Sequence, residues 1–218
     1  MNRTALKIFM LLALTSCGRV KNYAIDADLK THFNYNVGTY WIYKDSASGR
    51  VDSFAVFYNQ YTPAGVSTAD QHTADDINIG IEEFNTTGLL DSTQWSWYLV
   101  SNIIEIDRYV IANGTDYNIQ YYSFVSYPFQ TGEVGSSIIV PNAYSNGLVT
   151  NIFPSYSVNG QAFSQVAEIY FNDSTSVPPY HADWFYLSQD TGIIKMRLYG
   201  QADSPQKVWE LQRWHIVK

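Results

Sequence analysis

The sequence predicts an all-β protein in which a twisted antiparallel sheet forms a sandwich or a partial barrel, with little helix. Three observations lead to this class. Of the 218 residues, 46% are hydrophobic and 16% aromatic, including 18 tyrosines, whereas 15% are charged. Aromatic side chains pack well on the pleated, half-buried surface of a sheet. Short segments of alternating apolar and polar residues recur between turn-forming residues, and none shows the helical period over three turns.

The first expected strands form a hairpin. Residues 40–43 and 51–61 flank a segment rich in Asp, Ser and Gly, which favours a connecting loop. In the second strand, Phe54, Val56 and Tyr58 alternate with Ser53, Ala55 and Asn59. We therefore expect Phe54, Val56 and Tyr58 to share one face of the sheet.

Further strands follow a loop at 62–73. Ile77, Ile79 and Ile81 alternate with Asn, Gly and Glu, which predicts a strand with one apolar face. Asn113-Gly114 is a dipeptide that favours a tight hairpin turn between two strands. The strands expected in this part of the chain lie at 95–100, 103–111 and 117–125.

The second half of the chain contains its least regular region, at 128–154. Here we expect a short strand at 136–140 and a loop or short helix at 142–151. Asn159-Gly160 predicts a second hairpin turn. The remaining strands are expected at 163–171, 184–187, 193–199 and 208–217.

The chain shows no internal repeat, low-complexity tract or shift of composition that would mark a second domain. We therefore expect a single β-rich domain over 36–218. Residues 17–35 are polar and lack a clear period, so we interpret them as a tether that leads into this domain.

The N-terminus has the order of a secretory signal peptide. Arg3 and Lys7 form a basic segment without acidic residues, and the apolar run 8–14 follows. The run is too short to span a bilayer, because a helical span needs about 20 apolar residues. Residues 1–16 are therefore predicted to be a removable signal peptide.

The residues Leu14-Thr15-Ser16-Cys17 resemble the lipobox of bacterial lipoproteins. The resemblance implies cleavage before Cys17 and attachment of lipid to its thiol, so that the partner of the chain is a membrane. The alternative is an ordinary signal peptide with a chance cysteine. The position of the single cysteine at this junction favours lipidation. By the same resemblance, Gly18 favours the outer membrane, and the absence of an acidic run after Cys17 favours its periplasmic side.

Two further segments resemble a loose class of uncharacterised Gram-negative lipoproteins. One is a Gly followed by an aromatic strand, at 37–44, and the other is a Gly-led strand at 190–195 with a closing strand at 209–211. The resemblance implies a twisted antiparallel sheet and no established activity.

The charge of the chain argues against a nucleic acid partner. The net charge is −7, and removal of Arg3 and Lys7 with the signal peptide leaves 11 basic against 20 acidic residues, a net charge of −9. Binding of phosphate backbones depends on a basic surface, and no cluster of Lys or Arg provides one.

No catalytic motif, cofactor site or metal site is predicted. The four histidines are scattered, and His181 with Asp183 is the closest approach to a ligand pair. Paired carboxylates such as Glu105 and Asp107 could serve a glycosidase, but an acidic chain offers such pairs by chance. We interpret them as solvated charge and expect no enzyme.

Aromatic residues are the candidate binding residues. Trp95 and Trp97 are two apart on one expected strand, with Tyr98 on its opposite face, and Tyr121 and Tyr122 come from a neighbouring strand. Such residues could stack on sugar rings or line an apolar cavity, whereas the simpler interpretation is that they belong to the core.

The sequence therefore favours an anchored envelope protein that binds an apolar or lipid ligand, or a glycan, without catalysis. A structural or accessory subunit of an envelope complex is the alternative, and a hydrolase ranks third.

Overall fold

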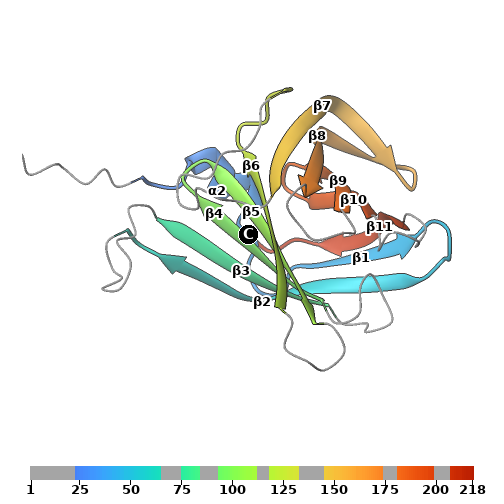
Figure 1. Cartoon of the computed structure of the whole chain (residues 1–218), viewed down its shortest axis with the longest axis horizontal. Helices are drawn as coiled ribbons and strands as arrows, with labels where there is room; N and C mark the ends of the chain where they lie inside the picture. The colour runs from blue at the N-terminus through green and yellow to red at the C-terminus, as the bar shows by residue number, and fades with distance from the viewer. Residues whose placement is uncertain are drawn as a thin grey trace, which may run out of the picture.

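A computed structural model describes residues 23–64, 75–83, 93–111, 118–132, 145–173, 181–198 and 207–218. In these residues one short helix precedes a series of strands (Figure 1). The elements are α2 (Ala27–Phe33), β1 (Tyr40–Asp45), β2 (Val51–Thr62), β3 (Asp76–Glu83), β4 (Thr93–Val100), β5 (Ile103–Ile111), β6 (Asn118–Ser126), β7 (Ser145–Val158), β8 (Gln161–Asp173), β9 (His181–Ser188), β10 (Gly192–Leu198) and β11 (Lys207–His215).

The strands form one closed sheet in the order β1-β11-β10-β9-β8-β7-β6-β5-β4-β3-β2. Closure results from β1, which pairs antiparallel with both β2 and β11. Neighbours are antiparallel, except that β6 and β7 run parallel and pair at Ser123 with Ser145 and at Phe124 with Asn146. The prediction of an all-β fold is confirmed, and of its two alternatives, a sandwich or a partial barrel, the structure has the barrel. Figure 1 shows the group β2 to β6 at an angle to the group β7 to β11.

The hairpin predicted at Asn159-Gly160 is confirmed. Both residues have positive φ angles, 50° and 77°, which is the geometry of the two-residue turn that Asn-Gly favours. The expectation of a loop or short helix at 142–151 is wrong for the described part, because β7 begins at Ser145. Val149, which is 1% exposed, pairs with Ile169 of β8. Burial against this apolar strand outweighs the polar character of the segment.

A bulge in β2 changes the face on which Tyr58 lies. Phe54 and Val56 are buried as expected, but the register with β3 shifts between Val56 and Tyr58. Tyr58 pairs with Gly80 instead of with one of the buried isoleucines, and the intervening Phe57 is exposed. The prediction that Tyr58 shares the face of Phe54 and Val56 is therefore wrong, since one extra residue reverses the alternation.

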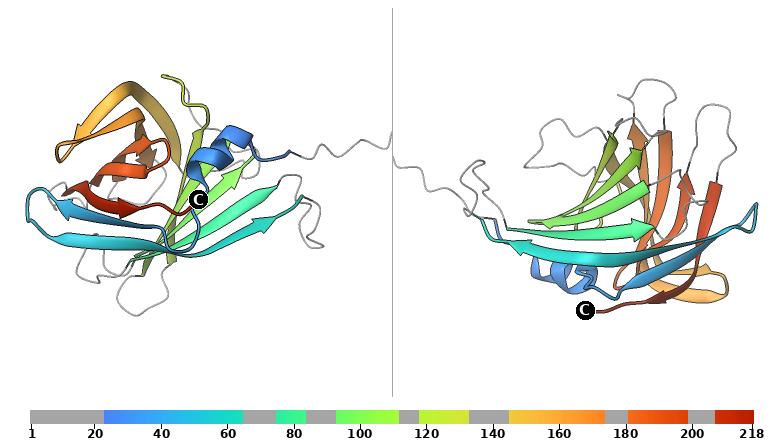
Figure 2. Two further views of the ribbon diagram at one scale, coloured as in Figure 1. Left: turned by 180° about the vertical axis from the view of Figure 1, so that it is seen from behind. Right: turned by 90° about the horizontal axis from the view of Figure 1, so that it is seen from below.

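Helix α2 lies within residues 17–35, the segment predicted to be a tether. Asp26 caps its N-terminus by accepting a hydrogen bond from the backbone N–H of Leu29 at 3.0 Å. Leu29, Phe33 and the following Tyr35 are completely buried and belong to the core. The start of the domain, expected at residue 36, is thus placed too late. A helix of two turns is too short for its period to be recognised in the sequence. Figure 2 shows α2 against one end of the strands, beside the C-terminus.

The described part of the chain contains no helix with the length and apolar character that crossing a membrane requires.

Candidate functional site

A cavity inside the closed sheet is the candidate site, and we call it the barrel cavity. It is lined by aromatic and aliphatic side chains from five strands. They converge because alternate residues of each strand point inward, and Trp41 of β1 pairs directly with Phe54 of β2. The lining residues are Trp41, Tyr43, Phe54, Ile81, Trp97, Ile193 and Met196.

The barrel cavity is small. The space in which the centre of a water molecule fits is about 20 Å³, which corresponds to one or two water molecules. A larger ligand such as an acyl chain would have to displace side chains. Met196 is a lining residue suited to this, because an unbranched thioether side chain adapts its shape readily.

Two aromatic side chains of the lining donate hydrogen bonds to backbone carbonyls. Trp41 donates a hydrogen bond from Nε1 to the carbonyl of Thr191 at 2.6 Å. Tyr43 donates its hydroxyl to the carbonyl of Ile193, also at 2.6 Å. Burial raises the pKa of Tyr43 well above its ordinary value, so its hydroxyl stays protonated. These bonds anchor both rings at the start of β10 and make the lining predominantly apolar.

Tyr35, just after α2, packs beside this lining. Its ring lies edge-on to Trp41, with centroids 5.1 Å apart, and to Trp97, with centroids 5.7 Å apart. The side chain is completely buried, and its hydroxyl has no hydrogen-bond partner among the described residues. A Cβ at Gly192 would lie 3.1 Å from this hydroxyl. Burial, with the charge effects of Tyr43 and Asp190, raises the pKa of Tyr35 well above its ordinary value.

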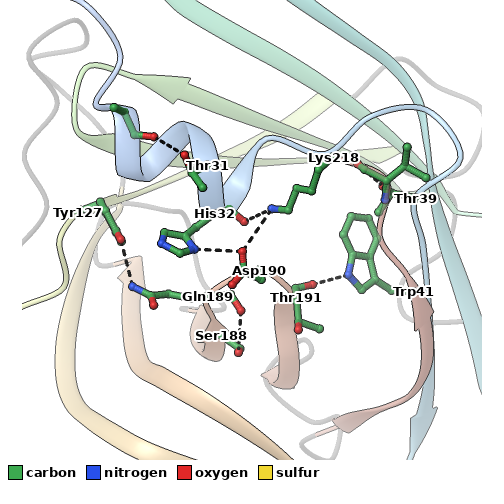
Figure 3. A network of polar contacts seen from close by, with 12 residues as sticks. Thr31, His32, Thr39, Trp41, Tyr127, Ser188, Gln189, Asp190, Thr191 and Lys218 are labelled. Atoms are coloured by element: carbon green, nitrogen blue, oxygen red, sulfur yellow. Dashed lines mark hydrogen bonds and ion pairs between the residues drawn. The ribbon is translucent and has the colours of Figure 1, made fainter.

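A polar cluster links the helix to the turn between β9 and β10, and we call it the helix-anchoring cluster (Figure 3). His32 Nδ1 lies 3.0 Å from Asp190 Oδ1. Lys218 Nζ lies 3.9 Å from the same oxygen, donates a hydrogen bond to the carbonyl of His32 and lies 4.6 Å from the centroid of the Tyr35 ring. Gln189 donates to the hydroxyl of Tyr127 at 3.0 Å.

Within this cluster, Lys218 has a lowered pKa. Burial lowers the pKa of its ammonium group to about 8, against the opposing effect of Asp190. The Asp190 side chain is 63% exposed, so each ion pair alone contributes little to stability. We interpret the helix-anchoring cluster as a clasp between α2 and the sheet.

The structure does not bring the aromatic residues predicted to bind a ligand together on one described surface. Trp97 is 3% exposed and lines the barrel cavity, so it lies in the core and not on an open face. Tyr98 is half-buried and pairs with Asn78 on the neighbouring strand. Trp95, Tyr121 and Tyr122 have described backbone positions in β4 and β6, but their side chains lie outside the described residues, as does Cys17.

The polar residues considered as metal ligands or catalytic groups are not brought together in the described part of the chain. That part contains no group of three or more His, Cys, Asp or Glu side chains that could hold a metal ion. His181 and Asp183 lie on β9, and their side chains are outside the described residues. Glu105 is half-buried on β5, and the side chain of its expected partner Asp107 is not described.

Most of the cavity lining was not predicted as a site. Trp41 and Tyr43 alternate within 40–43, and Phe54 and Ile81 lie on predicted apolar faces, so their burial was accessible from the sequence. Their convergence with Ile193 and Met196 depends on closure of the sheet between the first and last strands. No local pattern contains that information.

The fold and the cavity define an all-β protein whose single closed sheet encloses an apolar core. No known protein family matches the sequence, and no curated protein resembles it significantly. Among solved structures, one similar chain is a candidate lipoprotein from Parabacteroides distasonis ATCC 8503, with 13% sequence identity and a TM-score of 0.45. The similarity covers 84% of this chain and 99% of that one.

Proposed function

We propose that the protein is a lipid-anchored component of the cell envelope that binds an apolar ligand inside its closed sheet, without catalysis. The observation that carries this proposal is the barrel cavity, whose seven lining side chains include no charged group. Burial of an apolar ligand there would release water from apolar surface, which is the main driving force for such binding.

The anchor is proposed from the sequence. Cleavage before Cys17 and acylation of its thiol would attach the chain to the membrane, since each buried methylene group contributes about 0.8 kcal/mol. The outer membrane, on its periplasmic side, is the proposed location, on the strength of Gly18 and of the absence of an acidic run after Cys17.

Intact-mass spectrometry tests the anchor. Protein purified from membranes in detergent is compared with a Cys17→Ala variant. We expect the wild type to lack residues 1–16 and to carry the mass of acyl chains, and the variant to carry none. An unmodified wild-type cysteine would contradict the proposal.

A fluorescent probe tests the cavity. N-phenyl-1-naphthylamine brightens in apolar surroundings, so its fluorescence reports binding, and substitutions in the cavity lining report the place. We expect saturable binding to the Cys17→Ala protein. The variant Ile81→Phe, which fills the cavity, should weaken binding at least about fivefold, given that overpacking costs about 1–3 kcal/mol.

Ile77→Phe is the matched control, because Ile77 is 2% exposed on the same strand but does not line the cavity. It carries the same overpacking risk, and circular dichroism confirms folding of both variants. Equal effects of the two substitutions on affinity, or no probe binding at all, would contradict a site in the barrel cavity.

A role as an accessory subunit is the second candidate. Val51, Phe57 and Tyr61 of β2 are between 48% and 52% exposed, and in this role they would be covered by a partner protein, as contiguous exposed apolar surface is in protein complexes. Chemical cross-linking in intact cells, with Phe57→Ser as the variant, would distinguish this role through loss of a specific cross-linked partner.

A further inference from the structure

We infer that the ligand of the barrel cavity is amphipathic and that its polar end is an uncharged hydrogen-bond acceptor, such as an ester or amide carbonyl, which is bound by the Tyr35 hydroxyl. This inference rests on the proposed function and assigns the chemical class of the ligand.

The position of Tyr35 provides the first step. Its ring contacts Trp41 and Trp97, which both line the barrel cavity. The hydroxyl is buried without a partner among the described residues. Buried polar groups in folded proteins are almost always hydrogen-bonded, so a hydroxyl left unpaired beside an apolar cavity indicates a partner supplied by a ligand.

The surrounding backbone explains why the Tyr35 hydroxyl has no acceptor among the described residues. The carbonyls of Thr191 and Ile193, on either side of Gly192, already accept hydrogen bonds from Trp41 and Tyr43. Gly192 has a φ of +88°, and a Cβ there would lie 3.1 Å from the Tyr35 oxygen. A side chain at position 192 would therefore crowd the hydroxyl, and glycine avoids this beside the lining residue Ile193.

The charge distribution favours an uncharged ligand end. None of the seven lining residues is charged, and an ionised group buried there would lack a partner at high cost. The ammonium group of Lys218 lies over the ring of Tyr35 and belongs to the helix-anchoring cluster with Asp190. Burial keeps the Tyr35 hydroxyl protonated because its pKa is raised, so it is available as a donor.

A second buried donor supports the same ligand class. Trp209 is 1% exposed, and its Nε1 has no partner among the described residues. It pairs in register with Met196, which lines the barrel cavity. Tyr35 and Trp209 thus both lie next to lining residues with an unused donor, and an acceptor-bearing ligand complements them.

The test compares three probes of equal chain length in competition with N-phenyl-1-naphthylamine, on the Cys17→Ala protein. The probes are hexadecane, methyl palmitate and palmitate at pH 8. We expect methyl palmitate to bind more tightly than either of the others. Tyr35→Phe should weaken methyl palmitate binding about 3- to 10-fold, the value of one hydrogen bond, and leave hexadecane binding unchanged.

Tyr127→Phe is the matched control, because Tyr127 also packs against α2 through Phe33 but its hydroxyl is already bonded to Gln189. It should leave the affinities of all three probes unchanged. If Tyr35→Phe lowers the affinity for methyl palmitate no more than that for hexadecane, the inference is wrong while the apolar site stands. The same holds if palmitate binds best. If no probe binds, the proposed function fails and the inference fails with it.

Discussion

The ring of Tyr58 occupies the place where a side chain on Gly80 would lie. A Cβ built on Gly80 would come within 2.0 Å of Tyr58 Cε1 and within 2.4 Å of Cδ1. The two residues pair across β2 and β3, and the Tyr58 hydroxyl donates to Asn78 Oδ1 at 2.9 Å. An aromatic ring that covers a glycine on the neighbouring strand stabilises the pairing and defines its register.

Gly80→Ala should therefore destabilise the protein by about 1–3 kcal/mol, the usual cost of overpacking. The added methyl group must displace the ring of Tyr58 and break its bond to Asn78. The free energy of unfolding in urea measures the loss. In a Tyr58→Ala background the same substitution should cost far less. An equal cost in both backgrounds would mean that the ring is not the obstacle.

A second prediction concerns the core role of α2. Phe33 is completely buried and packs edge-on against Tyr127 and Phe129, with centroids 5.6 and 5.9 Å apart. Phe33→Ala should lower the free energy of unfolding by about 3–5 kcal/mol, as expected for loss of a buried aromatic ring.

Thr31→Ala, on the exposed side of the same helix, should change stability little, because its exposed hydroxyl bonds to the carbonyl of Ala27 within the helix itself. If both variants unfold at the same urea concentration as the wild type, α2 would be a loosely attached tether, as the sequence suggested.

The strands could be predicted from the sequence because their signals are local. Ile77, Ile79 and Ile81 alternate cleanly, and Asn159-Gly160 marks a hairpin whose register follows from the turn. The bulge before Tyr58 could not be predicted, because it accompanies the packing of one ring over Gly80 on another strand, which no local pattern contains.

The candidate site was harder to predict than the strands. Trp97 was recognised as a candidate, but its neighbours in the cavity, such as Ile193 and Met196, are brought to it by closure of the sheet. The burial of Tyr35 depends on the docking of helix α2. This helix has seven residues, which is too short for the 3.6-residue period to be recognised in the sequence.

A third prediction separates binding from stability at two tyrosines. Tyr43→Phe removes a buried donor from the carbonyl of Ile193 and should cost about 1–3 kcal/mol. Tyr35→Phe removes a hydroxyl that has no partner among the described residues, so it should leave the stability of the ligand-free protein unchanged or raise it. Urea unfolding of both variants provides the measurement. A loss at Tyr35→Phe as large as that at Tyr43→Phe would show that the Tyr35 hydroxyl already has a partner in the free protein.

A fourth prediction follows from the pKa of Lys218, which is lowered to about 8 by burial. An unfolded chain has a lysine pKa near 10.4, so between about pH 8 and 10 the unfolded state binds more protons than the folded state. The contribution of Lys218 to stability should therefore rise with pH in this window. The size of the effect is reduced by solvent, since the Lys218 side chain is 37% exposed.

Lys218→Met isolates this contribution, because a methionine keeps the apolar stem over the ring of Tyr35 without the charge. We expect the difference in unfolding free energy between wild type and variant to shift in favour of the wild type from pH 7.5 to pH 9.5. The tyrosines of the unfolded chain, whose pKa lies near 10, begin to ionise in this range, but they do so equally in wild type and variant and cancel in the difference. A difference that is constant over this range would mean that Lys218 is ionised as in water, and that the helix-anchoring cluster does not bury its ammonium group.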